Sequence, residues 1–489
     1  MSPRLRVVFL TYSLAGGGAE RQLLHLLHSA WPADIEPVLL CMDRPEAYVK
    51  SYDALPVRWL MPPDTVLPLD QLVALVHETF DPDTQLVASL ALVAPLTSML
   101  QQLADGVPTI LISPLFDLLP AAVLARSLLG AQIPIVGIEQ VNPSHFFRHE
   151  LDLPERARIA FPRVLRAAYA KTDRIVAVSR AIRDTLVRDF DVDPERIECI
   201  PNAVALEKLE PRRPSPTLTI AAMGRLHPVK RYDFLLRSAA LLRHRSNVPF
   251  SVVILGQGAE QESLERLARD LGIASMVRLP GFDPSPWKQL AAADIFAHTS
   301  ATEAQPLAIL EAMGMGFPVV TTRWDGVNEL VIDGVNGFVT DDDPDTFADA
   351  LARLAGDARL RARMGRAGSE KAREFDLRTS VFPKYLQLVQ ALAPRAVPVP
   401  RRPVSFSPCE WAGRAADPIR LVAHHSYVRE LPSLGFDCTP LVFDEVVSVR
   451  PPLDERYLIV SRRWPDMIDH WRAAGGPVPL HRAALLHST

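Results

Sequence analysis

The chain has few cysteines for its length, four in 489 residues, and no two of them form a C-x-x-C pair. They are scattered along the chain as Cys41, Cys199, Cys409 and Cys438. This spacing argues against a disulfide framework and against a zinc site, and it indicates buried thiols in a reducing compartment. We therefore expect a cytoplasmic protein.

Long apolar runs and a strong charge of either sign are also missing. The apolar stretch at 86–100 is interrupted by polar residues and by proline, and it falls short of the roughly 20 residues that span a bilayer. The run Val7–Leu10 is short for a signal peptide and favours a buried first strand. A net charge of −4 argues against nucleic acid as a partner. Peripheral attachment of the first half to a membrane surface stays an open alternative.

The composition indicates a globular protein with more than one domain, because 48% of residues are hydrophobic and 22% are charged. Strand and helix patterns alternate from residue 5 to about 140, and the pattern starts again near 218. This rhythm predicts α/β domains with parallel, doubly wound sheets. Segments rich in proline and arginine at 210–216 and 394–408 are typical of linkers.

One strand-to-helix junction carries two glutamates. An apolar strand at 294–297 leads into a polar loop with Glu303, and a helix from about Pro306 to 315 contains Glu311. Proline suits a first helical position, since its missing N–H would be unsatisfied there. A pair of glutamates alone is usually a solvated face. Two carboxylates around a helix start that attracts anions, however, suit a nucleotide sugar.

Two cations bracket another loop. Arg225 and Lys230 lie between a strand at 218–223 and a helix at 232–242, so the loop can direct both side chains to one point. Two fixed cations can stabilise a departing nucleoside diphosphate without a metal. Two solvated basic residues are the simpler interpretation of this spacing.

A glycine loop follows the first strand. Gly16, Gly17 and Gly18 come between a strand at 6–11 and a helix, which lets backbone approach a phosphate closely. The order differs from G-x-G-x-x-G, so the nicotinamide fingerprint is not met. A permissive turn is the alternative.

These segments together resemble glycosyltransferase family 4, retaining enzymes of the GT-B architecture. The resemblance rests on the 299–329 segment with both glutamates, on the Arg225/Lys230 loop and on the string G-G-A-E-R, and it extends over most of residues 5–393. It implies two Rossmann-like domains that face a cleft, followed by a small α/β extension. The implied divisions are an acceptor domain at 1–209 completed by a crossing helix at 376–393, a nucleotide-sugar domain at 210–375, a linker at 394–408 and an extension of unassigned role at 409–489.

The resemblance also assigns roles to single residues. Arg225 and Lys230 would bind the diphosphate, Glu303 the transferred sugar and Glu311 the ribose. The remaining implied donor contacts are Gly17, Gly18, Gln305, Gly281 and the amides of Leu307 and Ala308. The implied scheme uses no metal and no cofactor.

The sequence departs from the family pattern at two places. Relatives often carry a histidine where Gln140 stands, and His145 five residues later is the candidate replacement. Ala203 in the interdomain segment stands where relatives usually have glycine. Either Gln140 or His145 could supply the hydrogen bond to the sugar.

The implied reaction transfers a sugar from a nucleotide sugar to a hydroxyl of a saccharide, with retention at the anomeric carbon. The G-G-A-E-R resemblance favours a lipid-linked saccharide acceptor at the inner face of the cytoplasmic membrane, in surface polysaccharide or glycoconjugate synthesis. Two alternatives remain: a sugar-nucleotide epimerase of the same fold and a non-catalytic nucleotide-binding scaffold. The sequence identifies neither the sugar, nor the base, nor the acceptor.

Overall fold

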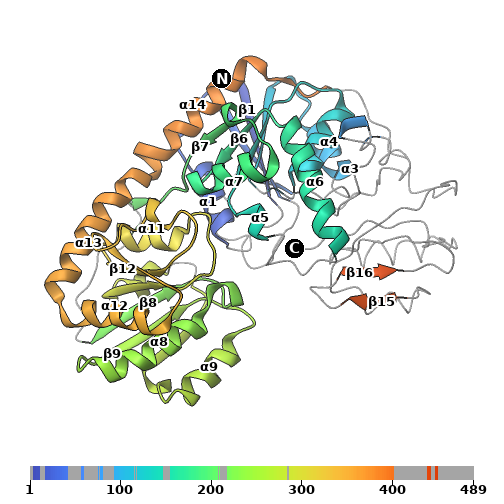
Figure 1. The fold of residues 1–489 in the computed structure, drawn as a ribbon. Coiled ribbons are helices and arrows are strands. Elements are labelled where there is room, and N and C mark those ends of the chain that lie inside the picture. The colour runs from blue at the N-terminus through green and yellow to red at the C-terminus, as the bar shows by residue number, and fades with distance from the viewer. Residues whose placement is uncertain are drawn as a thin grey trace.

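The chain folds into two lobes that are joined at their edges (Figure 1). The first lobe is built on the sheet that contains β1, and the second lobe on the sheet that contains β8. The computed structural model describes residues 4–11, 17–41, 57–59, 75, 78–80, 93–114, 116, 118–146, 155–206, 209, 217–283, 286–400, 438–441 and 446–449.

The first sheet has the strand order β3-β2-β1-β4-β5-β6-β7, and these strands are parallel. The strands are β1 (Leu5–Thr11), β2 (Ile35–Cys41), β3 (Val57–Trp59), β4 (Pro108–Ser113), β5 (Ile135–Glu139), β6 (Arg174–Ala177) and β7 (Ile197–Cys199). The helices among them are α1 (Gly18–Leu27), α3 (Val93–Gln102), α4 (Leu119–Leu129), α5 (Pro143–His145), α6 (Glu155–Lys171) and α7 (Arg180–Phe190).

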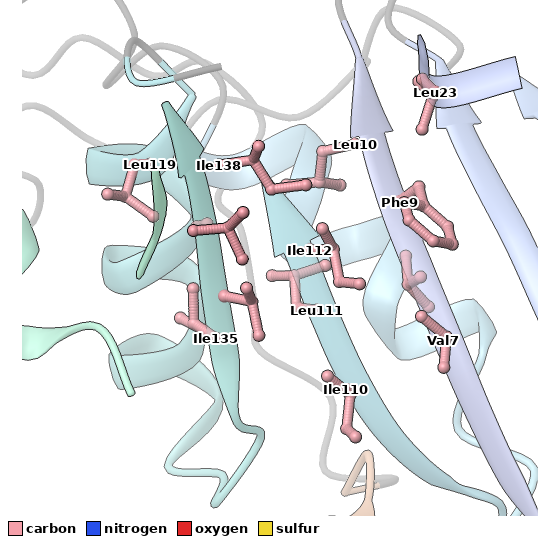
Figure 2. Close-up of a cluster of buried hydrophobic side chains, with 14 of the residues drawn as sticks. Val7, Phe9, Leu10, Leu23, Ile110, Leu111, Ile112, Leu119, Ile135 and Ile138 are labelled. Carbon is pink, nitrogen blue, oxygen red and sulfur yellow. The ribbon is translucent and has the colours of Figure 1, made fainter. Parts of the chain in front are cut away.

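Helices cover this sheet, so its central strands are apolar on both sides. Every residue of β1 is buried. Figure 2 shows side chains of β1, β4 and β5 in one cluster with Leu23 of α1 and Leu119 of α4. The charged exception in β1 is Arg6, whose guanidinium donates to Glu36 and to Asp105 at 2.7 and 2.6 Å. The ion pairs compensate the burial of its charge.

The second sheet has the strand order β10-β9-β8-β11-β12-β13, again with parallel neighbours. Its strands are β8 (Leu218–Met223), β9 (Phe250–Leu255), β10 (Val277–Gly281), β11 (Ile295–His298), β12 (Val319–Thr322) and β13 (Gly337–Thr340). Its helices are α8 (Tyr232–Arg245), α9 (Gln261–Asp270), α10 (Trp287–Leu290), α11 (Leu307–Gly314), α12 (Pro344–Gly356) and α13 (Ala358–Ala372).

Alternate residues of these strands belong to two separate cores. Ile220 and Ile254 face the core formed with α8 and α12, whereas Ala221 and Val253 face the core formed with α11. Successive side chains of a strand point to opposite faces of the sheet, so both faces of the second sheet are buried. The carboxyl ends of its strands are therefore where polar loops can collect.

After α13 the chain returns to the first lobe. Helix α14 (Phe382–Leu392) extends along the flank of the molecule (Figure 1) and packs Tyr385 and Leu388 into the core of the first sheet. The next residues form a short strand, β14 (Val397–Pro398), antiparallel to the start of β4. Part of the segment expected to be a linker is thus sheet. The reason is that β5 pairs with β4 only from Leu111 onward, which leaves the edge beside Pro108 and Thr109 available to β14.

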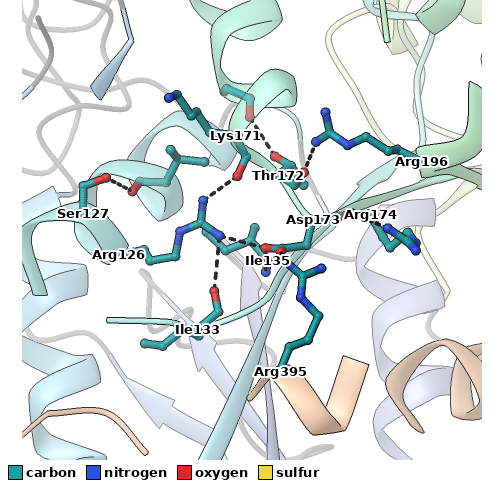
Figure 3. Close-up of polar contacts among 12 residues, drawn as sticks. Arg126, Ser127, Ile133, Ile135, Lys171, Thr172, Asp173, Arg174, Arg196 and Arg395 are labelled. Atoms are coloured by element: carbon teal, nitrogen blue, oxygen red, sulfur yellow. Dashed lines mark hydrogen bonds and ion pairs between the residues drawn. The ribbon is translucent and has the colours of Figure 1, made fainter. Parts of the chain in front are cut away.

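An ion-pair cluster fastens this returning segment (Figure 3). Arg395 approaches one oxygen of Asp173 at 2.6 Å, and Arg126 approaches the other at 2.8 Å. The Asp173 oxygen that Arg126 contacts also accepts a hydrogen bond from the backbone N–H of Ile135. One carboxylate thereby connects α4, β5 and the segment that follows α14.

The two segments that pass between the lobes contact each other. The backbone N–H of Val204 donates to the carbonyl of Phe375, and the N–H of Leu377 donates to the carbonyl of Val204, both at 2.9 Å. These backbone hydrogen bonds join the outgoing and returning chain into one hinge.

Within 409–489 the structure describes one antiparallel pair, β15 (Cys438–Leu441) and β16 (Val446–Val449). The rest of the expected extension lies outside the described residues, as does Gly16 of the glycine loop. Across the described part of the chain, no helix combines the length and the hydropathy needed to cross a membrane.

Candidate functional site

Most of the predicted site residues lie in loops and helix starts at the carboxyl ends of parallel strands. Gly17 follows β1, Lys230 follows β8, and Glu303 follows β11. The carboxyl ends of neighbouring parallel strands lie at one edge of a sheet, where ligands of α/β proteins bind. Contacts between α1 and α11 bring this edge of the second sheet to the first lobe.

Lys230 and Glu303 form an ion pair, with 2.6 Å between Nζ and Oε1. Their side chains are 22% and 14% exposed. The loops are fastened to each other beside the pair, since the Thr299 hydroxyl donates to the Lys230 carbonyl and the Ala301 N–H donates to the Val229 carbonyl. The structure thus brings together a predicted diphosphate cation and the predicted sugar carboxylate.

His298 is a third member of this group, and the sequence analysis missed it. It ends β11, is buried, and places Nε2 at 3.3 Å from Oε1 of Glu303 without the geometry of a hydrogen bond. Burial lowers the pKa of His298 to about 4, so the ring is neutral at pH 7. Burial is the largest influence on Glu303 and raises its pKa, but Lys230, with smaller effects of His298 and Ser300, acts in the opposite direction, and the net pKa lies below the usual value. Glu303 is therefore an ionised acceptor with Lys230 as its counter-charge.

Glu311 is on α11, and its charged partner comes from the other lobe. Nη1 of Arg21, on α1, lies 3.0 Å from Oε1 and 3.4 Å from Oε2 of Glu311. The Glu311 side chain is only 3% exposed, against 29% for Arg21. Burial raises the pKa of Glu311 to about 7, although Arg21 acts in the opposite direction. The carboxylate predicted to bind ribose is already engaged across the lobe interface.

The start of α11 has the geometry expected for an anion site. Pro306 is the N-cap residue, with extended backbone, and the first backbone hydrogen bond of the helix runs from the Ile309 N–H to the Pro306 carbonyl. The amides of Leu307 and Ala308 precede that bond and belong to the helix terminus that attracts anions. Gly18 of α1 faces this terminus, because a Cβ there would lie 4.0 Å from Leu307 Cδ1.

The start of α1 is occupied by its own glutamate. Gly17 is the N-cap, and a Cβ at that position would come within 2.3 Å of Oε2 of Glu20. Burial raises the pKa of Glu20, whereas Arg225 and the amides of Gly17 and Glu20 lower it. Arg225 is exposed on the second lobe, and its field acts on Glu20 across the interface. The side chains of Arg225, Glu20 and Arg21 therefore share the space beside the two helix starts.

Gln305 is buried at the hinge. Its Oε1 accepts from the Asn202 N–H, and its carbonyl accepts from the Asn202 side chain at 2.9 Å. Gln22 of α1 makes the matching contact, accepting from the Ala203 N–H at 2.9 Å. The Gln305 side chain thus connects the loop that carries Glu303 to the interdomain segment. Neither contact could be predicted from sequence patterns, because the residues that it joins are 103 and 181 positions apart.

Three other predicted positions lie outside this group of contacts. Gln140 directly follows β5 and donates to the Pro114 carbonyl at 3.4 Å. His145 ends α5, and its N–H donates to the Asn142 side chain. Gly281 ends the edge strand β10 with φ of 87°, a conformation that glycine adopts readily. The choice between Gln140 and His145 stays a prediction.

An interdomain cavity of about 1100 Å³ lies near the hinge, and Gln305 is among the residues that line it. Its lining includes the start of α7, the segment after β12 and the end of α13. Here Glu329 accepts from the backbone N–H groups of Arg180 and Ala181 at 3.0 and 3.3 Å. The Glu329 carboxylate of the second lobe thereby accepts hydrogen bonds from N–H groups at the start of α7 that have no partner within the helix. Throughout the described residues, no three His, Cys, Asp or Glu side chains gather as ligands of a metal ion would.

Two family models match the chain in succession. The model described as Glycosyltransferase Family 4 matches residues 16–208, and the model described as Glycosyl transferases group 1 matches residues 207–371. Between them they cover more than half of the chain.

Curated relatives are glycosyltransferases. The chain is 34% identical over 232 residues to the D-inositol 3-phosphate glycosyltransferase of Saccharomonospora viridis, covering 43% of this chain and 53% of that protein. It is 32% identical over 187 residues to the lipopolysaccharide core biosynthesis glycosyltransferase LpsE of Rhizobium meliloti, covering 38% and 54%. The chain spans about half the length of these curated relatives.

Solved structures share the fold. Anabaena HepE, in complex with UDP, matches with a TM-score of 0.62 and 20% identity over 79% of this chain and 100% of that one. Sucrose-phosphate synthase from Thermosynechococcus elongatus matches with a TM-score of 0.63 and 16% identity over 80% and 99%. The chain belongs to glycosyltransferase family 4 and has the GT-B architecture of two Rossmann-like lobes.

Proposed function

We propose that this protein transfers a sugar from a nucleotide sugar to a hydroxyl of a saccharide acceptor, with retention at the anomeric carbon. The observation that carries the proposal is the grouping at one end of the second sheet. The Lys230–Glu303 pair lies on two adjoining loops, and the second of these loops leads into α11, which carries the buried Glu311. Arg225 stands at the start of the same loop as Lys230. Cations, free amides and two carboxylates are the groups that a nucleotide diphosphate sugar requires.

The diphosphate binds to Arg225, Lys230 and the amides of Leu307 and Ala308. A helix start and fixed cations both stabilise negative charge, and this charge increases as the glycosidic bond breaks. Support for a nucleotide-sugar donor comes from HepE, a protein of the same fold whose structures hold UDP and UDP-glucose. Arg225 is exposed, so its guanidinium is accessible to a ligand.

Glu303 and Glu311 accept hydrogen bonds from donor hydroxyls. An ionised carboxylate has two oxygens and about four lone-pair directions, so Glu303 can keep Lys230 and still accept from the sugar. Glu311 does the same for the ribose. In this scheme the acceptor oxygen attacks the anomeric carbon from the side that the diphosphate leaves. A donor phosphate oxygen takes the acceptor proton, and the nucleoside diphosphate departs with the bond electrons.

The acceptor is a polyhydroxy compound, and a lipid-linked saccharide fits best. The names of both relatives support a polyhydroxy acceptor, since one names an inositol phosphate and the other lipopolysaccharide core biosynthesis, and support for a lipid-linked saccharide comes from the second. The reaction then takes place in the cytoplasm, with the protein at the inner face of the membrane during transfer to a lipid-linked acceptor.

Calorimetric titration with UDP, GDP, ADP and their common sugar derivatives tests the donor. Glu311→Ala is the site variant, and Glu262→Ala, at an exposed glutamate of α9, is the control. We expect one nucleotide to bind, with binding lost in Glu311→Ala and kept in the control. Absence of binding by every nucleotide contradicts the proposal.

Turnover then separates the reaction classes. Release of the nucleoside diphosphate that depends on an added saccharide supports the transferase. Conversion of the donor to an epimer without acceptor supports an epimerase, and binding without any turnover supports a scaffold. The anomeric configuration of the product, read by NMR coupling constants, tests retention.

A further inference from the structure

Arg21 and Glu311 join the two lobes at the point where the donor ribose is expected. The contact links α1 to α11, across 290 positions of sequence, and Nη1 of Arg21 approaches both carboxylate oxygens. We propose that Arg21 is a positioning residue for donor binding: it aligns the Glu311 carboxylate for the ribose hydroxyls and favours the ionised form of that carboxylate. This inference rests on the proposed function.

The charge of Glu311 depends on Arg21. An ionised carboxylate buried without a partner is costly, and it usually takes up a proton instead. The Glu311 side chain is 3% exposed, and burial is the largest cause of its raised pKa of about 7. Arg21 supplies the opposing effect through its charge and its hydrogen bond. Since a guanidinium stays charged at all working pH values, this support is permanent.

The other groups around Glu311 do not replace Arg21. Helix α11 packs on α13, β11 and β12. On these elements, the buried His298 faces Glu303. Lys371, on α13, pairs with Glu374, which lies just after that helix. Among the described residues, the charged side chain that acts on Glu311 is Arg21.

The geometry leaves room for the ligand. A single guanidinium nitrogen of Arg21 contacts the two oxygens of Glu311 at 3.0 and 3.4 Å, which uses part of the carboxylate's four lone-pair directions. Two vicinal hydroxyls can occupy the others. Arg21 and ribose therefore bind the same carboxylate together, and each aligns it for the other.

Neighbouring contacts hold α1 in place beside α11. Gln22, the next residue on α1, accepts from the backbone of Ala203 in the interdomain segment. Gln305, on the loop before α11, accepts from Asn202 in the same segment. One turn of α1 thus contacts both Glu311 and the interdomain segment, and these contacts fix Arg21 relative to Glu311.

The test is the pH dependence of nucleotide affinity between pH 6 and pH 9, measured by calorimetry with UDP, or with GDP or ADP if the donor screen selects that base. The variants are Arg21→Gln, Arg21→Lys and, as control, Arg4→Gln, an exposed arginine of the first lobe. In Arg21→Gln the pKa of Glu311 rises further, because the charge and the hydrogen bond of Arg21 no longer oppose the effect of burial. The carboxyl group is then protonated at neutral pH. We expect affinity about 10-fold weaker than wild type at pH 7, recovering toward pH 9.

Arg21→Lys keeps a positive charge and should give an intermediate profile, while Arg4→Gln should match the wild type. A wild-type affinity and pH profile in Arg21→Gln, with Glu311→Gln clearly weakened, overturns the inference and leaves the proposed function standing. If Arg21→Gln does not fold, the Arg21→Lys profile decides: an intermediate profile supports the inference, and a wild-type profile overturns it. Failure of the wild type to bind any nucleotide overturns the proposed function itself.

Discussion

Replacing Lys230 by methionine would leave the Glu303 carboxylate buried without its ammonium partner. The pair is short, 2.6 Å, and both side chains are largely shielded from water. Removing one member of a buried ion pair costs about 3–5 kcal/mol, because the remaining charge is desolvated without compensation. Since both side chains keep some exposure, we expect the lower end, about 3 kcal/mol of unfolding free energy at pH 7.

The sign of the pH dependence makes this prediction specific. In the wild type the pKa of Glu303 is lowered, so its stabilising contribution is present above its unfolded value of 4.5 and is lost as pH falls through the folded pKa. In Lys230→Met, burial dominates and the folded pKa lies above 4.5. The free energy of unfolding of the variant then falls as pH rises from 4.5 through the raised folded pKa of Glu303. The difference in unfolding free energy between the two proteins should therefore be small near pH 4 and largest near pH 7.

Urea denaturation of both proteins at several pH values measures this difference. His298 also titrates in this range, but it is present in both proteins, so the comparison is made between them. Lys371→Met is the matched control, because Lys371 pairs with the exposed Glu374 and should contribute less than about 1 kcal/mol. The double variant Lys230→Met/Glu303→Gln should recover most of the loss. A difference that is the same at pH 4 and pH 7, or no recovery in the double variant, would refute the reasoning.

Substitutions at three further positions have distinct expected outcomes. Arg225→Ala should lower kcat about 100-fold with an unchanged melting temperature, because Arg225 is exposed and acts on the diphosphate; steady-state kinetics and calorimetry measure the two quantities. Gly256→Ala should cost about 3 kcal/mol in urea denaturation, because a Cβ would lie 1.8 Å from the carbonyl oxygen of Gly224, and wild-type stability would contradict this packing. Glu329→Ala should destabilise the protein by about 1 kcal/mol, since it uncovers the helix start at Arg180, whereas Glu329→Gln should retain part of the contact; thermal unfolding compares them.

The sheets and the junctions between strand and helix were predictable because burial on both faces leaves apolar runs in the sequence. The strand expected at 294–297 is Ile295–His298, and the helix expected from 306 to 315 is Leu307–Gly314. The candidate loops were predictable for the same reason, since they follow the ends of those strands.

Contacts between the lobes could not be predicted from local patterns. Arg21 and Glu311 are 290 positions apart, and Glu329 is 149 positions from Arg180. No periodicity encodes the docking of two separate sheets. In the sequence, His298 is the end of an apolar strand. Only its position beside Glu303 in the structure indicates that it belongs to the candidate site.

The return of the chain to the first lobe has a consequence for the order of events during synthesis. Helix α14 and strand β14 complete the first core, yet the ribosome makes them only after the whole second lobe. Domains generally fold as units during translation. Here the second lobe can fold first. The first lobe cannot complete its core until residues 382–399 are made, so part of its apolar surface stays exposed until then. A nascent chain stopped near residue 375 should therefore need chaperone protection that the full chain does not, and release of a further 25 residues or so should end that need.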